Sequence, residues 1–250
     1  MEQRERVLIV SVQTTQTDED FAYANQELAQ LVDTAMGEVV ATVTQKREAI
    51  SGRTLVGKGK VEEISHLVDE LEVDLVVFYQ SLTGSMVKNL NESINCRIID
   101  RVQLILDIFA MRARSKEGKL QVQLAQLNYL LPRLSGQREG LSRQGGGIGT
   151  RGPGETRLET DRRYIRKQIQ DIEEQLEQIK KHRERSREKR KSSNGFQLGL
   201  IGYTNAGKST ILNQLTQAGT YQMDQLFATL DPLTRQVDLF PNFEVTLTDT

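Results

Sequence analysis

Eight consecutive residues, Gly202–Ser209, have the composition and spacing of a phosphate-binding loop, G-x-x-x-x-G-K-[ST]. Glycine allows the backbone to wrap so that successive N–H groups point at phosphate oxygens. Lys208 could then reach the β- and γ-phosphates of a nucleotide, and the hydroxyl of Ser209 is placed for Mg²⁺. The alternative to a nucleotide site is an ordinary strand-to-helix turn.

The residues on either side of this segment favour the nucleotide site. A short apolar run, Phe196–Ile201, precedes it and predicts a strand. Ile211, Leu212 and Leu215 follow at helical spacing and predict a helix over 209–215. Strand, glycine loop and helix is the order that a phosphate-binding loop requires, because it brings the phosphates to a helix N-terminus.

A carboxylate near the end of the sequence fits the same chemistry. Val245 and Leu247 alternate with polar residues, which predicts a half-exposed strand over 243–250. Asp249, at its end, stands where nucleotide-binding domains place the carboxylate that orients Mg²⁺, although a surface carboxylate is the alternative. About fifty-five residues remain from Phe196 onward, whereas a nucleotide-binding domain usually needs ~150. We therefore expect the base-selecting residues to lie beyond Thr250, and the 250 residues alone to bind nucleotide poorly and hydrolyse it negligibly.

The composition is typical of a cytoplasmic protein with no membrane span. Hydrophobic residues make up 37% of the sequence, and no apolar run approaches the ~18 residues that cross a bilayer. Residues 1–6 lack the apolar region of a secretory signal. The single cysteine, Cys96, excludes an intrachain disulfide and is interpreted as a structural thiol. His66 and His182 lie far apart on charged helical stretches, so we expect surface histidines and no metal cluster of this kind.

Charge is distributed unevenly along the sequence. Residues 1–100 contain 9 Lys and Arg against 17 Asp and Glu, whereas residues 112–167 contain 13 against 5. A basic segment inside a protein whose net charge is only −1 indicates an acidic partner for that segment. Nucleic acid is the commonest such partner.

Residues 1–110 predict a small α/β domain with a mainly parallel sheet. The elements behind this prediction are strands over 7–12, 38–44, 75–79 and 97–100 and helices over 20–32 and 60–71. Within the domain, the glycines and lysines of Leu55–Lys60 could form either a helix-start turn or a contact with phosphate or RNA. We favour the turn, because a lone glycine–lysine turn is weak support for a ligand.

Residues 111–192 predict an antiparallel helical hairpin. Two apolar stripes recur at helical spacing, and each is too narrow to be buried on all sides. They can bury one another in a coiled-coil-like pair. Their members are Leu120, Leu124, Leu127, Leu131 and Leu134 in the first stripe and Ile165, Ile169, Ile172, Leu176 and Ile179 in the second.

The segment 136–157, between the two stripes, contains eight of the chain's 19 glycines. Few apolar residues are present to pack it, and a long loop of this kind is usually functional or disordered. Arginine side chains form paired hydrogen bonds with phosphates, and glycines let the backbone approach bases closely. The segment is therefore a candidate RNA-binding element, and the alternative is a plain linker. The candidate RNA-binding residues are Arg138, Arg143, Arg151 and Arg157. The basic residues of 180–191 could also contact RNA, or could simply suit a helix C-terminus.

Taken together, these residues resemble a known family. Gly202–Ser209, Phe227–Asp231 and Asp249 are similar to the corresponding parts of translation-factor-like GTPases. The glycine-rich Gly145–Arg163, and the stretches 106–110 and 112–122, resemble signatures of the HflX family. The resemblance extends over essentially the whole chain, and it implies an N-terminal α/β domain (1–110), a helical hairpin (111–192) and the first part of a P-loop GTPase domain (196–250).

The resemblance also implies an activity and its site residues. It implies a GTPase, monomeric, that binds GTP and GDP, associates with the large ribosomal subunit and its RNA, and dissociates stalled or idle ribosomes under stress. Ser209 and Thr229 would bind Mg²⁺ directly and Asp249 through water, with Thr234 a competitor of Thr229. The nucleotide-binding residues would be Gly202, Tyr203, Thr204, Asn205, Ala206, Gly207, Lys208, Ser209, Thr210, Phe227, Ala228, Thr229, Leu230, Asp231, Asp249 and Thr250.

Three points stay open at this stage. No catalytic side chain is evident. Asn205 resembles the asparagine of potassium-activated GTPases, but asparagine also simply favours turns. A P-loop ATPase of unrelated function and a non-catalytic RNA-binding module are the rival interpretations of the whole chain.

Overall fold

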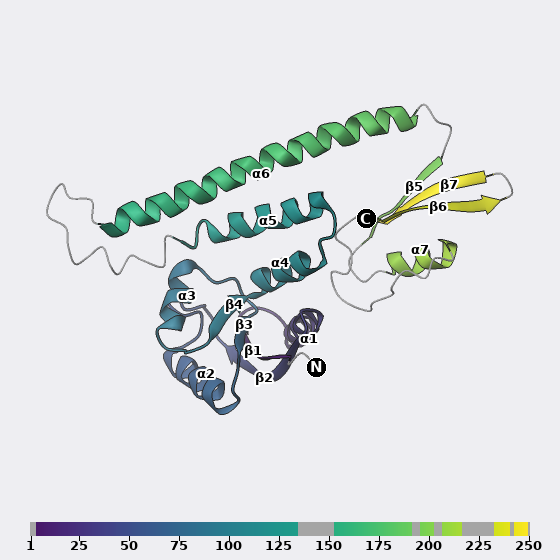
Figure 1. Ribbon diagram of the computed structural model, residues 1–250. Helices are drawn as coiled ribbons and strands as arrows, with labels where there is room; N and C mark the ends of the chain where they lie inside the picture. The colour runs from purple at the N-terminus through teal and green to yellow at the C-terminus, as the bar shows by residue number, and fades with distance from the viewer. Residues whose placement is uncertain are drawn as a thin grey trace. The chain divides into compact units, whose positions relative to one another are not determined.

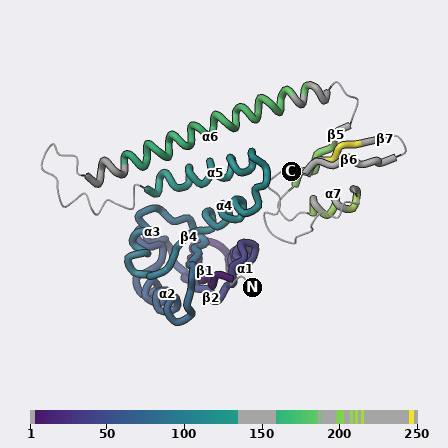
Figure 2. The backbone as a smooth tube through the Cα atoms, in the orientation of Figure 1, coloured from purple at the N-terminus to yellow at the C-terminus, as the bar shows by residue number. Residues whose placement is uncertain are grey.

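The computed structural model describes residues 4–134, 153–191, 196–202, 207–216, 233–240 and 243–249. They fall into two compact units, one of residues 1–107 with 125–169 and one of residues 108–124 with 170–250. Figure 1 labels the helices and strands, and Figure 2 follows the backbone through them. In chain order these elements are β1 (Glu5–Gln13), α1 (Asp18–Thr34), β2 (Gly37–Lys46), α2 (Lys58–Glu70), β3 (Leu75–Phe78), α3 (Gly84–Asn91), β4 (Arg97–Asp100), α4 (Arg101–Arg112), α5 (Lys116–Leu130), α6 (Pro153–Lys191), β5 (Phe196–Leu200), α7 (Lys208–Thr216), β6 (Leu233–Phe240) and β7 (Phe243–Asp249).

The N-terminal sheet has the strand order β2-β1-β3-β4, and all of its strand pairs are parallel. The side chains of alternate β1 residues lie on opposite faces of the sheet. Leu8, Val10 and Val12 join a core cluster with residues of α2 and α3. On the other face, the hydroxyl of Ser11 donates to the side-chain oxygen of Asn25 on α1 at 2.6 Å. Helices therefore cover both faces, as Figure 1 shows, and the predicted parallel α/β domain is confirmed.

Two helices of this domain were not predicted, although local signals for both exist. Thr83 precedes α3, and its side chain accepts a hydrogen bond from the backbone N–H of Met86, as an N-cap residue does. Asp100 likewise precedes α4 and accepts from the backbone N–H of Gln103 at 3.0 Å. A threonine and an aspartate before apolar stretches were thus helix-start signals.

Several smaller sequence interpretations are confirmed. Because α2 begins at Lys58, the segment Leu55–Lys60 is a helix-start turn, and the ammonium of Lys60 lies 2.7 Å from the carboxylate of Glu63. His66 and His182 are exposed. The thiol of Cys96 is half-buried and donates to the carbonyl of Val73, and burial raises its pKa, which disfavours a reactive thiolate.

The helical region begins its second helix earlier than expected. α6 starts at Pro153, so the last five residues of the expected 136–157 loop are helical. Proline suits the first position of a helix, because its missing N–H would be unpaired there and its φ is already helical. α5 ends at Leu130, so Leu131 and Leu134 of the first stripe lie in the turn that follows.

Three members of the two apolar stripes are buried, and the other seven are partly buried. Leu120, Ile165 and Ile172 are all at most 9% exposed. Arg183, toward the end of α6, forms a 2.8 Å ion pair with Glu117 in the first turn of α5. The end of one helix therefore lies beside the start of the other, which is the pairing that an antiparallel hairpin requires.

None of the helices in the described ranges has both the length and the apolar composition required to cross a membrane. Among the same residues, no group of three or more His, Cys, Asp or Glu side chains is arranged to hold a metal ion.

A close backbone contact leaves no room for a side chain at Gly84. A Cβ atom built on this glycine would lie 2.3 Å from the carbonyl oxygen of Arg133. Both partners belong to the backbone, so no side-chain movement can relieve the clash. Replacing Gly84 with alanine is expected to lower the free energy of unfolding by about 3 kcal/mol.

Urea unfolding followed by circular dichroism measures this loss. The matched control is Gly59→Ala in α2, where an added Cβ meets nothing within 4 Å. That control is expected to stabilise the protein by about 0.5–1 kcal/mol, because alanine has the higher helix propensity. Equal stability of the two variants would contradict the clash.

Candidate nucleotide site

The segment Gly202–Ser209 connects a strand to a helix in the predicted order. β5 ends at Leu200 and α7 begins at Lys208, so the segment runs from the carboxyl end of a strand to a helix N-terminus. Ser209 and Thr210 occupy the first turn of α7. The middle of the segment, 203–206, lies outside the described residues.

The two ends of this loop are tied together by its lysine. The ammonium of Lys208 donates a hydrogen bond to the carbonyl oxygen of Gly202, at 2.9 Å. The cation at the start of the helix therefore lies next to the residue at which the loop begins. The first bond of the helix runs from the N–H of Ile211 to the carbonyl of Gly207, at 3.1 Å.

Gly207 has a left-handed backbone, with φ = +80°. This conformation costs a residue with a Cβ roughly 1–2 kcal/mol. Gly207→Ala is therefore expected to distort the loop and to lower the affinity of the full-length protein for GTP by about tenfold. A fluorescence titration with labelled GTP measures the change.

The control for this variant is Gly199→Ala on β5. An added Cβ there also meets nothing within 4 Å, and Gly199 has no positive φ. Gly199→Ala is expected to bind GTP as the unmodified protein does. If Gly207→Ala also bound GTP with unchanged affinity, the left-handed conformation of Gly207 would have no part in GTP binding.

Strand pairing brings Asp249 to the edge of the sheet from which the loop departs. β5 and β7 are parallel, and Leu200 is the Cα partner of Asp249. Both carboxyl ends therefore meet at one edge, with the backbone of Asp249 beside the residue that precedes the loop. The predicted strand ending in Asp249 is confirmed, since β7 spans Phe243–Asp249.

A third strand of this sheet was missed by the sequence analysis. β6 is antiparallel to β7, and its first residues, Leu233 and Thr234, pair with Asp249 and Thr248. The backbone of Thr234 thus lies at the same edge as the loop. The signal was present, because Val237 and Leu239 alternate with polar residues and the two residues Pro241 and Asn242 separate β6 from β7.

These positions fit a magnesium ion. Mg²⁺ prefers oxygen ligands from hydroxyls and carboxylates and keeps several waters. Ser209 lies in the first turn of α7, the helix that follows the loop, and Asp249 ends the strand paired with β5, so the backbone supplies one hydroxyl-bearing and one carboxylate-bearing residue at the two positions that the sequence predicted. The segment Phe227–Asp231, which includes Thr229, lies outside the described residues, as does Thr250.

The candidate RNA-binding arginines are described only in part. Arg157 lies on α6 rather than in a loop, which corrects the expected extent of the loop. Arg138, Arg143 and Arg151 fall outside the described residues. Their assignment stays a prediction.

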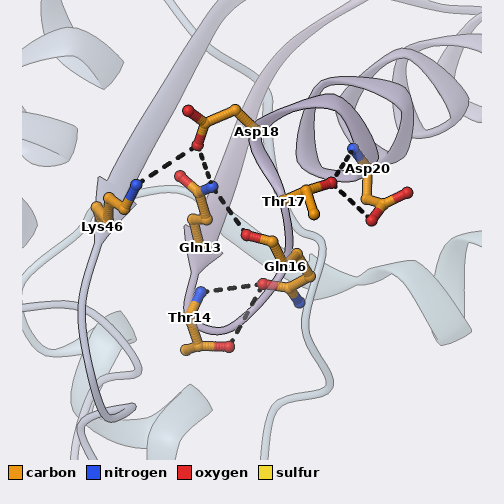
Figure 3. A network of polar contacts seen from close by, with 7 residues as sticks. All are labelled: Gln13, Thr14, Gln16, Thr17, Asp18, Asp20 and Lys46. Atoms are coloured by element: carbon orange, nitrogen blue, oxygen red, sulfur yellow. Dashed lines mark hydrogen bonds and ion pairs between the residues drawn. The ribbon is translucent and has the colours of Figure 1, made fainter.

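The carboxyl edge of the N-terminal sheet is the place where open α/β sheets usually bind ligands. Here it carries a network of polar side chains that bond to one another (Figure 3). The amide of Gln13 donates to the carboxylate of Asp18 at 2.6 Å, and Lys46 lies 3.4 Å from the same carboxylate. The bond from Gln13, followed by the charge of Lys46, lowers the pKa of Asp18. The amide of Gln80 bonds to both the N–H and the carbonyl of Val12. The described polar groups at this edge thus bond to one another and to the backbone of β1.

Three family models match successive parts of the chain. Residues 22–110 match "GTP-binding GTPase N-terminal", residues 112–190 match "GTP-binding GTPase Middle Region", and residues 197–250 match "50S ribosome-binding GTPase". Together they follow the α/β sheet, the helical region and the nucleotide site.

Curated relatives match over almost the whole chain, and each is described as "GTPase HflX". The protein from Alkalihalophilus pseudofirmus is 59% identical over 98% of this chain and 58% of its own length. Those from Caldanaerobacter subterraneus and Escherichia coli are 51% and 46% identical, over 99% and 98% of this chain and 57% of their own lengths. The chain thus spans about 58% of the length of these relatives.

A solved structure shares the fold. The structure described as "crystal structure of SsGBP and GDP complex" aligns with a TM-score of 0.53 over 97% of this chain and 61% of its own chain. Its sequence is 22% identical, so the likeness concerns the fold alone. The fold is an α/β domain with a parallel sheet, a helical region and the beginning of a P-loop GTPase domain.

Proposed function

Because the chain belongs to the HflX GTPase family, we propose that it binds GTP and GDP at Gly202–Ser209 and hydrolyses GTP in the full-length protein. Through this cycle the protein, a cytoplasmic monomer, associates with the large ribosomal subunit and dissociates stalled or idle ribosomes under stress. The single observation that supports the nucleotide site most strongly is the parallel register of Leu200 with Asp249. This register places Asp249 beside Leu200, the last residue of the strand that leads into the loop, at one edge of the sheet.

The residues of the site have distinct roles in this proposal. Backbone N–H groups of the loop hold the phosphates, and Lys208 compensates their charge. Ser209 and Thr229 would bind Mg²⁺ directly, and Asp249 would hold it through water. Bound Mg²⁺ would neutralise charge on the transferring phosphoryl group. Positioning and charge neutralisation carry the chemistry, and the ribosome is expected to stimulate it, since slow intrinsic hydrolysis is what makes such a protein a switch.

A competition titration separates this proposal from its rivals. Labelled GTP bound to the full-length protein should be displaced by unlabelled GTP at concentrations at least about a hundredfold lower than by ATP. Equal displacement by ATP would favour a P-loop ATPase. Failure to bind either nucleotide would favour a non-catalytic RNA-binding module.

Potassium offers a separate prediction about Asn205. If its side-chain oxygen helps hold a monovalent cation against the phosphates, GTP turnover by the full-length protein should be about tenfold faster in K⁺ than in Na⁺. Asn205→Ala should remove this difference. Equal rates in the two salts would leave Asn205 with only a turn-forming role.

A further inference from the structure

Three cations form a cluster on the first half of α6. Arg163, Arg166 and Lys167 are all exposed, and their spacing of three and four positions makes them neighbours on the helix surface. Ile165 and Ile172 of the same helix are buried, at 8% and 4% exposure. The α6 cation cluster therefore occupies the side of the helix that is turned away from its buried stripe.

The charges of this cluster are not balanced by nearby carboxylates. Across the residues that the structure describes, none of the three cations forms an ion pair. Glu159 and Asp171 are exposed residues, four positions before Arg163 and four after Lys167, and are not paired with the cluster. Like charges three or four positions apart destabilise a helix. An anionic partner would relieve this repulsion.

The basic end of the same helix differs from the cluster. The ammonium of Lys181 lies 3.9 Å from the carboxylate of Glu177, and the guanidinium of Arg183 lies 2.8 Å from that of Glu117 on α5. These two cations are compensated within the protein. The sequence could not separate the two groups, because both are basic runs on one helix. The ion pairs thus favour 163–167 over positions 181 and 183 as a surface for an acidic partner.

An exposed aromatic ring indicates which acidic partner fits. Tyr164 lies between Arg163 and Arg166 in the sequence and is 63% exposed. Unpaired bases of RNA stack on such rings, while arginine and lysine bind the phosphates beside them. An acidic protein surface would use the cations but would need no aromatic ring among them. The combination favours RNA.

We infer that Arg163, Tyr164, Arg166 and Lys167 form a contact surface for ribosomal RNA, separate from the segment 136–157. The inference rests on the proposed function and names residues through which the protein holds the RNA of the large subunit. The cations bind phosphates, and the tyrosine ring stacks on an unpaired base. The surface is no part of Gly202–Ser209, so it affects affinity for the subunit and leaves affinity for GTP unchanged.

The first test compares two triple variants of the full-length protein, bound to a non-hydrolysable GTP analogue. One variant replaces the three cations of the cluster with glutamine. The matched control makes the same change in charge at three exposed cations of other segments, namely Arg53, Lys58 and Lys119. Sedimentation with purified large ribosomal subunits at several salt concentrations measures the affinity of each variant.

The cluster variant should bind the subunit about a hundredfold more weakly than the unmodified protein. Its slope of log affinity against log salt should be lower by about three, one unit for each phosphate contact. The control should bind within about threefold of the unmodified protein, and both variants should keep their GTP affinity. Equal weakening by the two variants, or unchanged binding of the cluster variant, would overturn the inference.

The second test identifies the partner at the tyrosine. Tyr164→benzoylphenylalanine places a photocrosslinker in the cluster, and Tyr23→benzoylphenylalanine places one at another exposed tyrosine, 71% exposed on α1. The first should crosslink to ribosomal RNA, and the second should not. Crosslinks from position 164 to ribosomal proteins alone, or no crosslink at all, would overturn the inference. If the unmodified protein failed to bind the subunit, the proposed function itself would fall.

Discussion

Lys208→Ala is expected to lower the affinity of the full-length protein for GTP by about a hundredfold or more. The ammonium crosses the loop to the carbonyl of Gly202, and a bound nucleotide would draw it to the β- and γ-phosphates. Two charge-assisted contacts of about 1.5–3 kcal/mol each would be lost. A fluorescence titration with labelled GTP measures the change.

The matched control for Lys208→Ala is Gln214→Ala, which alters an exposed residue of the same helix. It should leave GTP affinity unchanged. Circular dichroism should show that both variants retain their helices, since neither side chain contributes to a buried core. An affinity of Lys208→Ala within about twofold of the unmodified protein would exclude Gly202–Ser209 as the phosphate site.

The second large effect is expected from the arginines between the helices. Replacing Arg143 and Arg151 together with glutamine should weaken binding to the large ribosomal subunit by about a hundredfold, at about tenfold for each lost phosphate contact. The slope of log affinity against log salt should fall by about two, one unit for each contact. Ribosome splitting, followed by light scattering, should be lost as well.

A control with the same change in charge makes this result specific. Arg53 and Lys119 are exposed residues of the described part of the chain. Replacing both with glutamine should change the salt slope by less than half a unit. If this pair weakened subunit binding as much as the Arg143 and Arg151 pair does, the effect would be one of net charge, and 136–157 would be a linker.

Much of the fold could be predicted from the sequence, because its signals are local. The strands β1 to β4 are short apolar or β-branched runs, and their alternation with helices implied a parallel sheet. The phosphate-binding loop and the strand ending in Asp249 were found for the same reason, since each is a contiguous pattern with a physical meaning.

What the sequence did not reveal depends on contacts between distant residues. The pairing of Leu200 with Asp249 joins residues 49 positions apart, and it could only be inferred from motif order. The ion pair of Asp100 with Arg133 and the backbone contact of Arg133 with Gly84 have no sequence pattern, because they form only when the end of α5 meets β4 and α3. The start of α6 was misplaced because the flexibility of glycine was weighted above the helix-starting preference of Pro153.

The central claim is that the nucleotide bound at Gly202–Ser209 controls association with the large ribosomal subunit. Sedimentation of the full-length protein with ribosomes, in a non-hydrolysable GTP analogue and in GDP, tests it most directly. The protein should co-sediment with the large subunit in the GTP analogue and mostly remain in the supernatant in GDP, and Lys208→Ala should remove the difference. Equal co-sedimentation in the two nucleotides would contradict the claim.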